Sequence, residues 1–252
     1  MQNKLLAHSS IGNGKPVVFL HGFLESKSMW DYLHFSTNSF RFIFIDLPGH
    51  GETPFDDENE IPSIAYYADK VRTFLREYKI ALYDIVGHSM GGYVALELKK
   101  SDPNCQKVVL LNSNFWEDTE QKKRDRIRVA NLVFKAKSLF ISEAIPGLFF
   151  SKKVQDVEVQ DLINDAKKMT SDVIAYAALA MRERKDLTSI LQANPSDFMI
   201  LSGQHDPLIE PEEMRSRLPS GLIRLIFIEN AGHMAHIEQS EKTKEVICDF
   251  LQ

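Results

Sequence analysis

The chain has 252 residues, of which 44% are hydrophobic and 26% are charged, and its formal net charge is −5 at pH 7. This composition is close to the globular average and excludes the basic surface that nucleic-acid binding requires. No apolar run approaches the roughly 20 residues of a membrane span, and the first residues lack the apolar core of a signal peptide. We therefore expect a cytoplasmic protein, a monomer or a homodimer, in which Cys105 and Cys248 are free thiols.

Short runs rich in Val, Ile and Phe alternate along the chain with longer amphipathic stretches. Strands buried on both faces of a parallel sheet have this almost continuous apolar character. The alternation predicts an α/β fold with a doubly wound, mostly parallel sheet and helices on both faces. The expected strands are 16–20, 41–45, 81–86, 107–111, 198–201 and 222–228, and the expected helices between and after them are 64–78, 90–100 and 241–251.

The alternation stops between residues 115 and 191, where no run reads as a strand. Asp118 and Thr119 are both suited to cap a helix that continues to residue 137. Pro146 and Gly147 mark a turn, and helices are expected at 154–168 and 172–184. We therefore expect residues 1–114 and 192–252 to form the α/β core and residues 115–191 to form a helical cap over an active site.

The sharpest local motif is GHSMGG at residues 87–92, which contains G-x-S-x-G between an expected strand and an expected helix. That context is the one in which this motif forms a nucleophile elbow. Gly87 and Gly91 leave room for the chain to turn sharply around Ser89. The motif therefore predicts Ser89 as a nucleophile, with the Met90 N–H at the start of the helix as one donor to an oxyanion.

A serine hydroxyl needs a base, and an imidazole is the usual one. His233 follows the last expected strand, so it lies at the same edge of the sheet as Ser89. His236, three residues on, is the alternative, and we favour His233 because Gly232 frees the backbone before it. His88 is expected to be structural.

The base needs an orienting acid. Asp206 follows the strand 198–201, which gives the chain order Ser89, Asp206, His233 that this fold uses. Glu210 is the alternative acid, whereas the end of the strand 107–111 offers no carboxylate. The second oxyanion donor is expected to be the backbone N–H of Phe23, which follows the strand 16–20, with His21 as a structural hydrogen-bonding residue.

Together the motifs resemble the α/β-hydrolase fold of the broad esterase, lipase and C–C hydrolase group. The matching pieces are FLHGF at 19–23, DLPGHGET at 46–53, GHSMGG at 87–92, GQHDPL at 203–208 and NAGHMAHIE at 230–238. The resemblance spans nearly the whole chain and implies the fold and a Ser-Asp-His triad. It also implies that Asp46 and His50 belong to a structural loop and are not catalytic.

The stretch AGHMAH at 231–236 also resembles the menaquinone-pathway SHCHC synthases, which are lyases on this fold. That family has Tyr before the serine and Arg after the paired glycines, where this chain has His88 and Tyr93. A basic run at 122–128 either forms a solvated helix face or attracts an anionic substrate. Ser89 argues against the epoxide hydrolases and haloalkane dehalogenases, which use a carboxylate nucleophile.

The sequence thus predicts a serine hydrolase that cleaves an ester or similar carbonyl compound through an acyl-enzyme, without a metal or an organic cofactor. A lyase or C–C hydrolase on the same fold is one alternative, and a non-enzymatic receptor for a small ligand is another. We expect a small-molecule substrate in an apolar pocket. Its expected lining is Phe115, Trp116, Leu132, Phe149 and Met234.

Overall fold

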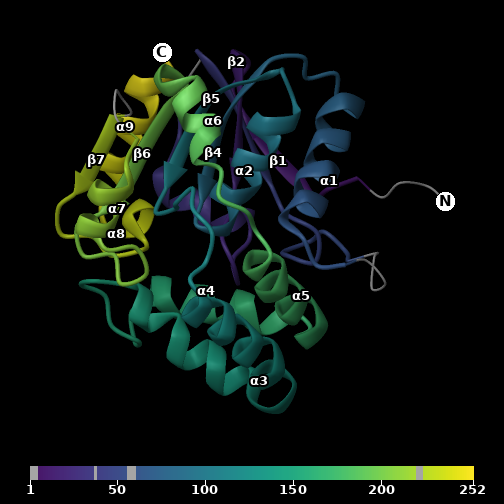
Figure 1. Cartoon of the computed structure of the whole chain (residues 1–252), viewed down its shortest axis with the longest axis vertical. Coiled ribbons are helices and arrows are strands. Elements are labelled where there is room, and N and C mark those ends of the chain that lie inside the picture. Colours follow the sequence, from purple (N-terminus) through teal and green to yellow (C-terminus); the bar gives the residue numbers. More distant parts are fainter. Residues whose placement is uncertain (1–4, 37–38, 56–60, 220–223) are drawn as a thin grey trace.

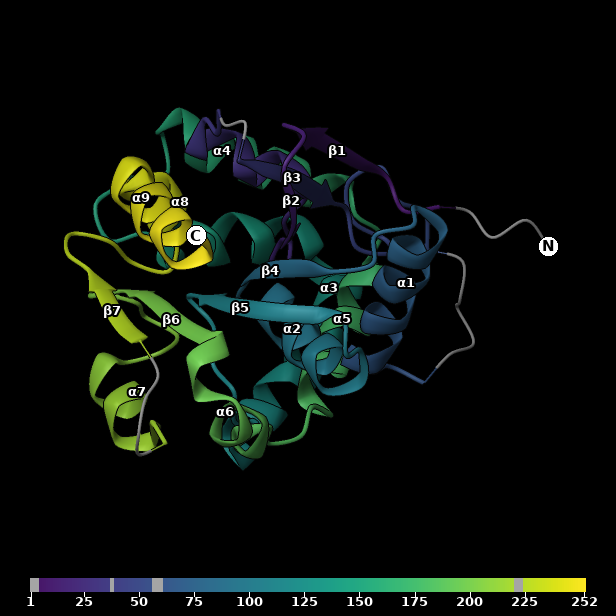
Figure 2. The ribbon, with the colours of Figure 1, turned by 90° about the horizontal axis from the view of Figure 1, so that it is seen from above.

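A seven-stranded sheet forms the centre of the molecule, in the order β1-β3-β2-β4-β5-β6-β7 (Figures 1 and 2). The structure is a computed structural model that describes residues 5–36, 39–55, 61–219 and 224–252. Only β1 is antiparallel to its neighbour, and the other strands pair in parallel. The strands are β1 His8–Ile11, β2 Lys15–Leu20, β3 Phe40–Ile45, β4 Tyr83–His88, β5 Cys105–Leu111, β6 Phe198–Gly203 and β7 Arg224–Ile228.

The predicted doubly wound α/β fold is confirmed, and each expected strand is present. The last one was predicted from residue 222, and its first two residues lie outside the described ranges. The edge strand β1 was missed because His8, Ser9 and Ser10 carry no apolar pattern. The strand β4 ends at His88, so that Ser89 follows it directly.

Alternate residues of each strand face opposite sides of the sheet, and each side has its own core. Val18 and Leu20 pack under α1 and α2, whereas Val17 and Phe19 pack under η1 and α9. Figure 2 shows α2, α6 and α7 on one side of the sheet and α8 and α9 on the other. These elements are η1 Lys27–Leu33, α1 Ile64–Glu77, α2 Met90–Ser101, α6 Thr188–Ala193, α7 Pro211–Arg217, α8 Ala235–Glu238 and α9 Ser240–Leu251.

The segment between β5 and β6 contains helices and no strand, and most of it lies beyond one end of the sheet (Figure 1). Thr119 caps its first helix by accepting a hydrogen bond from the Lys122 N–H. That helix runs past residue 137 to Ala144, across a break at Ala136, where φ is −147° and ψ is 43°. The elements are α3 Glu120–Ala144, η2 Pro146–Leu148, α4 Val157–Lys168 and α5 Ser171–Arg182, followed by α6 beside α2 and η3 Pro195–Asp197.

Among the described residues, no helix is both long enough and apolar enough to cross a membrane. Cys105 is buried, Cys248 is half-buried, and both are free thiols, as expected.

Candidate active site

Ser89 occupies a strained turn between β4 and α2. Its φ of 48° and ψ of −114° lie in a region that residues other than glycine rarely adopt. The glycines on either side make the turn possible. A Cβ at Gly87 would lie 2.3 Å from the carbonyl oxygen of Gly91, and a Cβ at Gly91 would lie 2.3 Å from that of Leu20. The close approach of β4, α2 and the end of β2 therefore requires glycine at both positions.

The neighbouring strand β5 fixes the backbone of Ser89. The Ser89 N–H donates to the carbonyl oxygen of Leu111 at 3.0 Å. The Ser89 carbonyl oxygen accepts hydrogen bonds from the Gly92 N–H at 3.0 Å and from the Ser113 hydroxyl at 2.7 Å. The turn is thus held from both sides, and the half-buried Ser89 side chain stands at the carboxyl end of the sheet.

Asp206 and His233 form a buried hydrogen-bonded pair. Nδ1 of His233 lies 3.0 Å from Oδ1 and 2.9 Å from Oδ2 of Asp206. Oδ1 of Asp206 also accepts the N–H groups of Leu208 at 2.9 Å and Ile209 at 3.2 Å. Burial raises the pKa of the Asp206 carboxyl, but His233 and the N–H donors outweigh it, so that this pKa lies below its usual value.

The contacts of His233 define the tautomer of its ring. Because Nδ1 faces carboxylate oxygens, it carries the hydrogen, and Nε2 is left with its lone pair. Within the described part of the chain, Nε2 is buried and has no hydrogen-bond partner. The His233 ring lies 5.1 Å, between centroids, from the ring of His88, the residue next to Ser89. The expected base therefore keeps a lone pair on Nε2, and its ring packs against the residue that precedes Ser89.

Asn112 is a site residue that sequence reasoning missed. It follows β5 with a φ of 45°, which asparagine tolerates better than most residues. Its Nδ2 donates to Asp206 Oδ2 at 2.8 Å and to the Gly232 carbonyl oxygen at 3.0 Å. The end of β5 therefore supplies no carboxylate but holds the one that β6 supplies. The signal in the sequence was a polar residue directly after a buried strand.

The loop after β2 carries Phe23, whose N–H is the expected oxyanion donor. The Phe23 N–H makes no hydrogen bond with any residue of the described ranges. Met90 begins α2, so its N–H lies at the positive end of a helix dipole. His21 has the expected structural contacts, because its Nε2 accepts the Leu47 N–H at 2.9 Å. Burial lowers the pKa of His21, which therefore stays neutral.

Glu25 and His88 form a second buried pair that the sequence analysis did not predict. Oε2 of Glu25 lies 2.9 Å from Nδ1 of His88, and it also accepts the Gly22 N–H at 2.5 Å. Nε2 of His88 lies 2.9 Å from the carbonyl oxygen of His233. His88 thus contacts the loop that carries the expected base.

His236, the alternative base, has no acid partner in the part of the chain that the structure describes. Its ring is fully buried between Trp30 and His88, at centroid distances of 5.6 Å and 4.8 Å. Neither ring nitrogen has a hydrogen-bond partner among the described residues. Burial, together with His88 and His233, holds the pKa of His236 well below its usual value. Of the two candidates, the geometry of the Asp206 pair favours His233.

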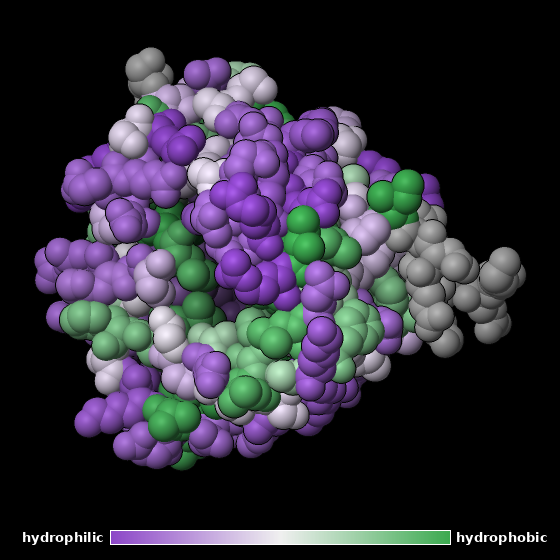
Figure 3. All heavy atoms as spheres, turned by 60° about the horizontal axis from the view of Figure 1, so that its bottom comes forward, coloured by the Kyte–Doolittle hydropathy of each residue, from purple (hydrophilic) through white to green (hydrophobic). Residues whose placement is uncertain are grey.

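The expected pocket residues do not form one group. Phe115 and Trp116 pack edge to face at 5.0 Å in the core beside α2. Phe149 and Met234 are buried in the core on the other side of the sheet, and Leu132 on α3 is 37% exposed. Their role in a substrate pocket stays a prediction. Figure 3 views the face that carries the helical segment and shows a hollow with hydrophobic side chains along part of its wall.

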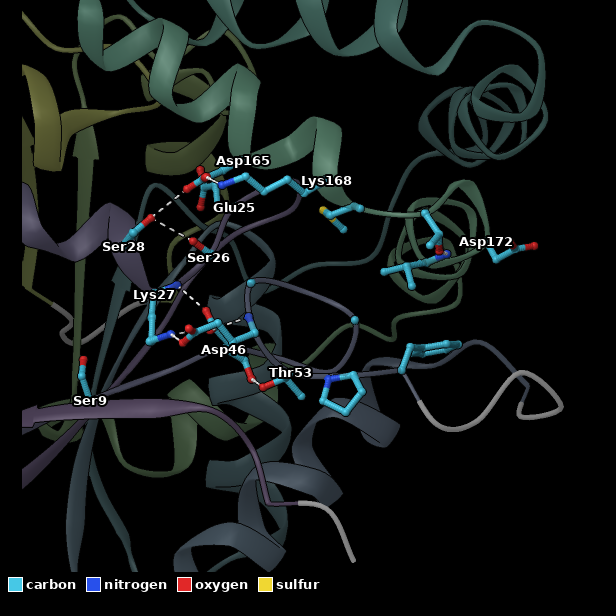
Figure 4. A pocket seen from close by; sticks show the side chains of 18 of the residues that line it. Ser9, Glu25, Ser26, Lys27, Ser28, Asp46, Thr53, Asp165, Lys168 and Asp172 are labelled. Atoms are coloured by element: carbon cyan, nitrogen blue, oxygen red, sulfur yellow. Dashed lines mark hydrogen bonds and ion pairs between the residues drawn. The ribbon is translucent and has the colours of Figure 1, made fainter.

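A cavity of about 660 Å³ lies between the helical segment and the loops that follow β2 and β3. In Figure 4, Glu25, Lys27, Asp46 and Lys168 lie around this space. Lys27 pairs with Asp46 at 2.7 Å, in agreement with a structural role for the Asp46 loop. The lining does not include Ser89, Asp206 or His233. Within the described residues, no group of three or more His, Cys, Asp or Glu side chains could hold a metal ion.

Comparison with known proteins assigns the chain to a family. The model of the alpha/beta hydrolase family matches residues 17–246. The AB hydrolase superfamily protein YisY of Bacillus subtilis (strain 168) is 28% identical, over 95% of this chain and 92% of its own. A putative 2-succinyl-6-hydroxy-2,4-cyclohexadiene-1-carboxylate synthase of the same organism is 24% identical, over 93% of this chain and 89% of its own.

Solved structures are similar over nearly the whole chain. A thermophilic esterase from Thermogutta terrifontis, solved with malate bound, is 28% identical with a TM-score of 0.88, and the match covers 98% of this chain and 92% of that one. An esterase from Exiguobacterium antarcticum has a TM-score of 0.86 at 20% identity, over 97% of this chain and 94% of that one, which supports the fold alone. The chain therefore belongs to the alpha/beta hydrolase family, and it is a hydrolase enzyme with the fold of that family.

Proposed function

We propose that this protein is a serine hydrolase that cleaves an ester or similar carbonyl substrate through a Ser89-Asp206-His233 triad. The observation that carries the proposal is the buried pair of His233 and Asp206 beside the strained turn of Ser89. The solved esterase from Thermogutta terrifontis, at 28% identity, supports an ester as the substrate class.

These contacts support the following mechanism. The Ser89 hydroxyl attacks the substrate carbonyl carbon, and Nε2 of His233 accepts its proton. The N–H groups of Phe23 and Met90 hold the negative oxygen, and one such donor is typically worth ~10²–10³ in rate. His233 then passes the proton to the leaving alcohol, and water hydrolyses the acyl-enzyme by the same route in reverse. Asp206 keeps Nδ1 of His233 protonated and stabilises the imidazolium.

We assign residues 115–191 as a cap over this site. The cap is joined directly to the loop of the base, because the His233 N–H donates to the Leu148 carbonyl oxygen at 2.8 Å. Glu238 connects the same two segments by further hydrogen bonds. Its Oε1 accepts the N–H groups of Phe150 at 2.9 Å and Ser151 at 2.7 Å, and its Oε2 accepts that of Gly232 at 2.7 Å.

Turnover of p-nitrophenyl esters of increasing acyl length by the wild type and by Ser89→Ala tests the proposal. We expect the wild type to hydrolyse at least the short esters and Ser89→Ala to lose at least ~10³-fold in kcat. Ser216→Ala, which removes the same atom from an exposed position on α7, is the matched control and should retain full activity. Equal activity of Ser89→Ala and the wild type would contradict the proposal.

A lyase is the second candidate, because relatives named as 2-succinyl-6-hydroxy-2,4-cyclohexadiene-1-carboxylate synthases align with most of the chain. The basic run at 122–128 gives this candidate little support. Lys123 pairs with Glu120 at 3.0 Å, and Arg126 pairs with Asp118 at 3.2 Å. Formation of that product faster than ester hydrolysis would make the lyase the native activity. A ligand that raises Tm without any turnover would instead support a receptor.

A further inference from the structure

The pair of Glu25 and His88 joins three of the chain segments that the proposed reaction needs. Oε2 of Glu25 accepts the Gly22 N–H, which precedes the oxyanion donor Phe23. His88 is the residue before the nucleophile, and its Nε2 bonds to the carbonyl oxygen of His233 at 2.9 Å. Both side chains are buried, Glu25 with 6% and His88 with 0% of its surface exposed.

The contacts of His88 favour the charged form of its ring. Nε2 faces a carbonyl oxygen, which can only accept a hydrogen bond, and Nδ1 faces the carboxylate of Glu25. Both ring nitrogens therefore donate, so His88 is an imidazolium paired with an ionised Glu25. Burial lowers the pKa of His88, but Glu25 outweighs it and the pKa is raised. Burial raises the pKa of Glu25, and His88 outweighs it in turn.

The backbone at Gly22 leaves room for the Glu25 and His88 side chains. A Cβ at Gly22 would lie 2.5 Å from Oε2 of Glu25 and 2.9 Å from Nδ1 of His88. Leu24 has a positive φ of 66°, within the turn that brings the Glu25 carboxylate back onto the Gly22 N–H. Glycine at position 22 is therefore a condition for the contact, and the oxyanion loop lies directly against the pair.

We propose that Glu25 and His88 are positioning residues for this hydrolase, and that their ion pair sets the spacing between the oxyanion loop, the nucleophile turn and the loop of His233. The inference rests on the proposed function. A buried charged pair holds its geometry more tightly than neutral contacts do, because separating the charges in a dry site is costly. Displacing a catalytic group by about 1 Å can cost ~10²-fold in rate.

The charged and titratable groups that face His88 come from several loops. Glu25 and His21 lie on the loop after β2, Asp206 on the loop after β6, and His233 and His236 after β7. Glu25 also lines the cavity of Figure 4, and we expect formate to enter from that side once Glu25→Ala has removed the carboxylate. Rescue of kcat by added formate therefore distinguishes a positioning role from a purely structural one.

The experiment compares Glu25→Gln, Glu25→Ala and His88→Gln with the wild type, using p-nitrophenyl acetate and titration of reactive sites with a fluorophosphonate. Glu77→Gln, the same change at an exposed position on α1, is the matched control. We expect kcat per titrated site to fall ~10–100-fold in the pair variants, with KM within about threefold of the wild type. Formate should restore part of kcat in Glu25→Ala and leave the wild type and His88→Gln unchanged.

A nitrogen-15 NMR measurement on the wild type supplies a readout that needs no variant to fold. We expect both ring nitrogens of His88 to be protonated at neutral pH, because each of them faces an acceptor. Variants that lose titratable sites but keep wild-type kcat per site would overturn the positioning role, as would a His88 ring with one bare nitrogen. A wild type without ester turnover would instead contradict the proposed function itself.

Discussion

Asn112 donates a 2.8 Å hydrogen bond to Oδ2 of Asp206, and the same amide donates to the Gly232 carbonyl oxygen at 3.0 Å. The carboxylate from β6 and the backbone beside His233 are thereby fastened to the end of β5. The orientation of the base thus depends on a strand that contributes no member of the proposed triad.

Asn112→Gly tests that dependence, because glycine accepts the φ of 45° while the amide is lost. We expect kcat to fall about 10-fold or more, and the free energy of unfolding to fall by ~1–3 kcal/mol because buried acceptors lose their donor. Urea unfolding and ester turnover measure the two effects. Asn104→Gly, at an exposed position, is the control. An Asn112→Gly enzyme with wild-type kcat would show that Asp206 needs no support from β5.

His233 and His236 are expected to respond in opposite ways to substitution. His233→Gln should lower kcat by several orders of magnitude, because the base and its hydrogen bond to Asp206 are both lost. His236→Phe should keep kcat within about 10-fold and Tm unchanged or higher, since it removes buried nitrogens that have no described partner. Ester turnover with a thermal melt distinguishes the two. A larger loss of kcat in His236→Phe than in His233→Gln would reverse the assignment of the base.

Much of this architecture could be predicted from the sequence, because the α/β core rests on strong local patterns. Buried parallel strands such as residues 41–45 are almost wholly apolar, and G-x-S-x-G has few uses between a strand and a helix. The exposed edge strand β1 has no such pattern, so it was missed. The order of Ser89, Asp206 and His233 placed all of them at one edge of the sheet, and the structure brings Asp206 and His233 into contact.

The residues that support the site could not be predicted in the same way. Asn112 and Glu25 act through contacts between segments that lie far apart in the chain, 94 residues for Asn112 with Asp206 and 63 for Glu25 with His88. A single sequence gives no sign of such a contact unless a motif spans it. The pocket prediction has a related weakness, because aromatic residues such as Phe115 and Trp116 also fill the core.

A buried ion pair joins the two ends of the helical segment, and we expect its loss to lower the free energy of unfolding. Asp118, before α3, pairs with Arg184, after α5, at 2.8 Å, and both side chains are at most 5% exposed. Asp118→Asn keeps the shape and removes the charge, so we expect the free energy of unfolding to drop by ~3–5 kcal/mol. Glu212→Gln, which breaks an exposed pair with Arg215, is the control and should leave the urea midpoint unchanged. Equal midpoints for the two variants would contradict a structural role for the Asp118 pair.

His50 makes stability depend on pH. Burial is the main cause that lowers its pKa to about 3, whereas an unfolded histidine titrates near 6.5. Between these values the unfolded state binds more protons, so the free energy of unfolding falls as pH falls, by up to ~1.4 kcal/mol per pH unit. Measured by urea unfolding, the free energy of unfolding should therefore fall less between about pH 7 and about pH 5 in His50→Gln than in the wild type. An equal fall in the two proteins would mean that His50 is not buried as a neutral ring.

Reaction with a fluorophosphonate, followed by mass spectrometry of the digested protein, is the most direct test of the proposed nucleophile. The strained turn at Ser89 and the pair of His233 and Asp206 predict a single modified residue, Ser89. Labelling should disappear in Ser89→Ala and slow sharply in His233→Gln. A wild-type enzyme that turns over esters yet carries the label on another residue, or on none, would contradict the assignment of Ser89.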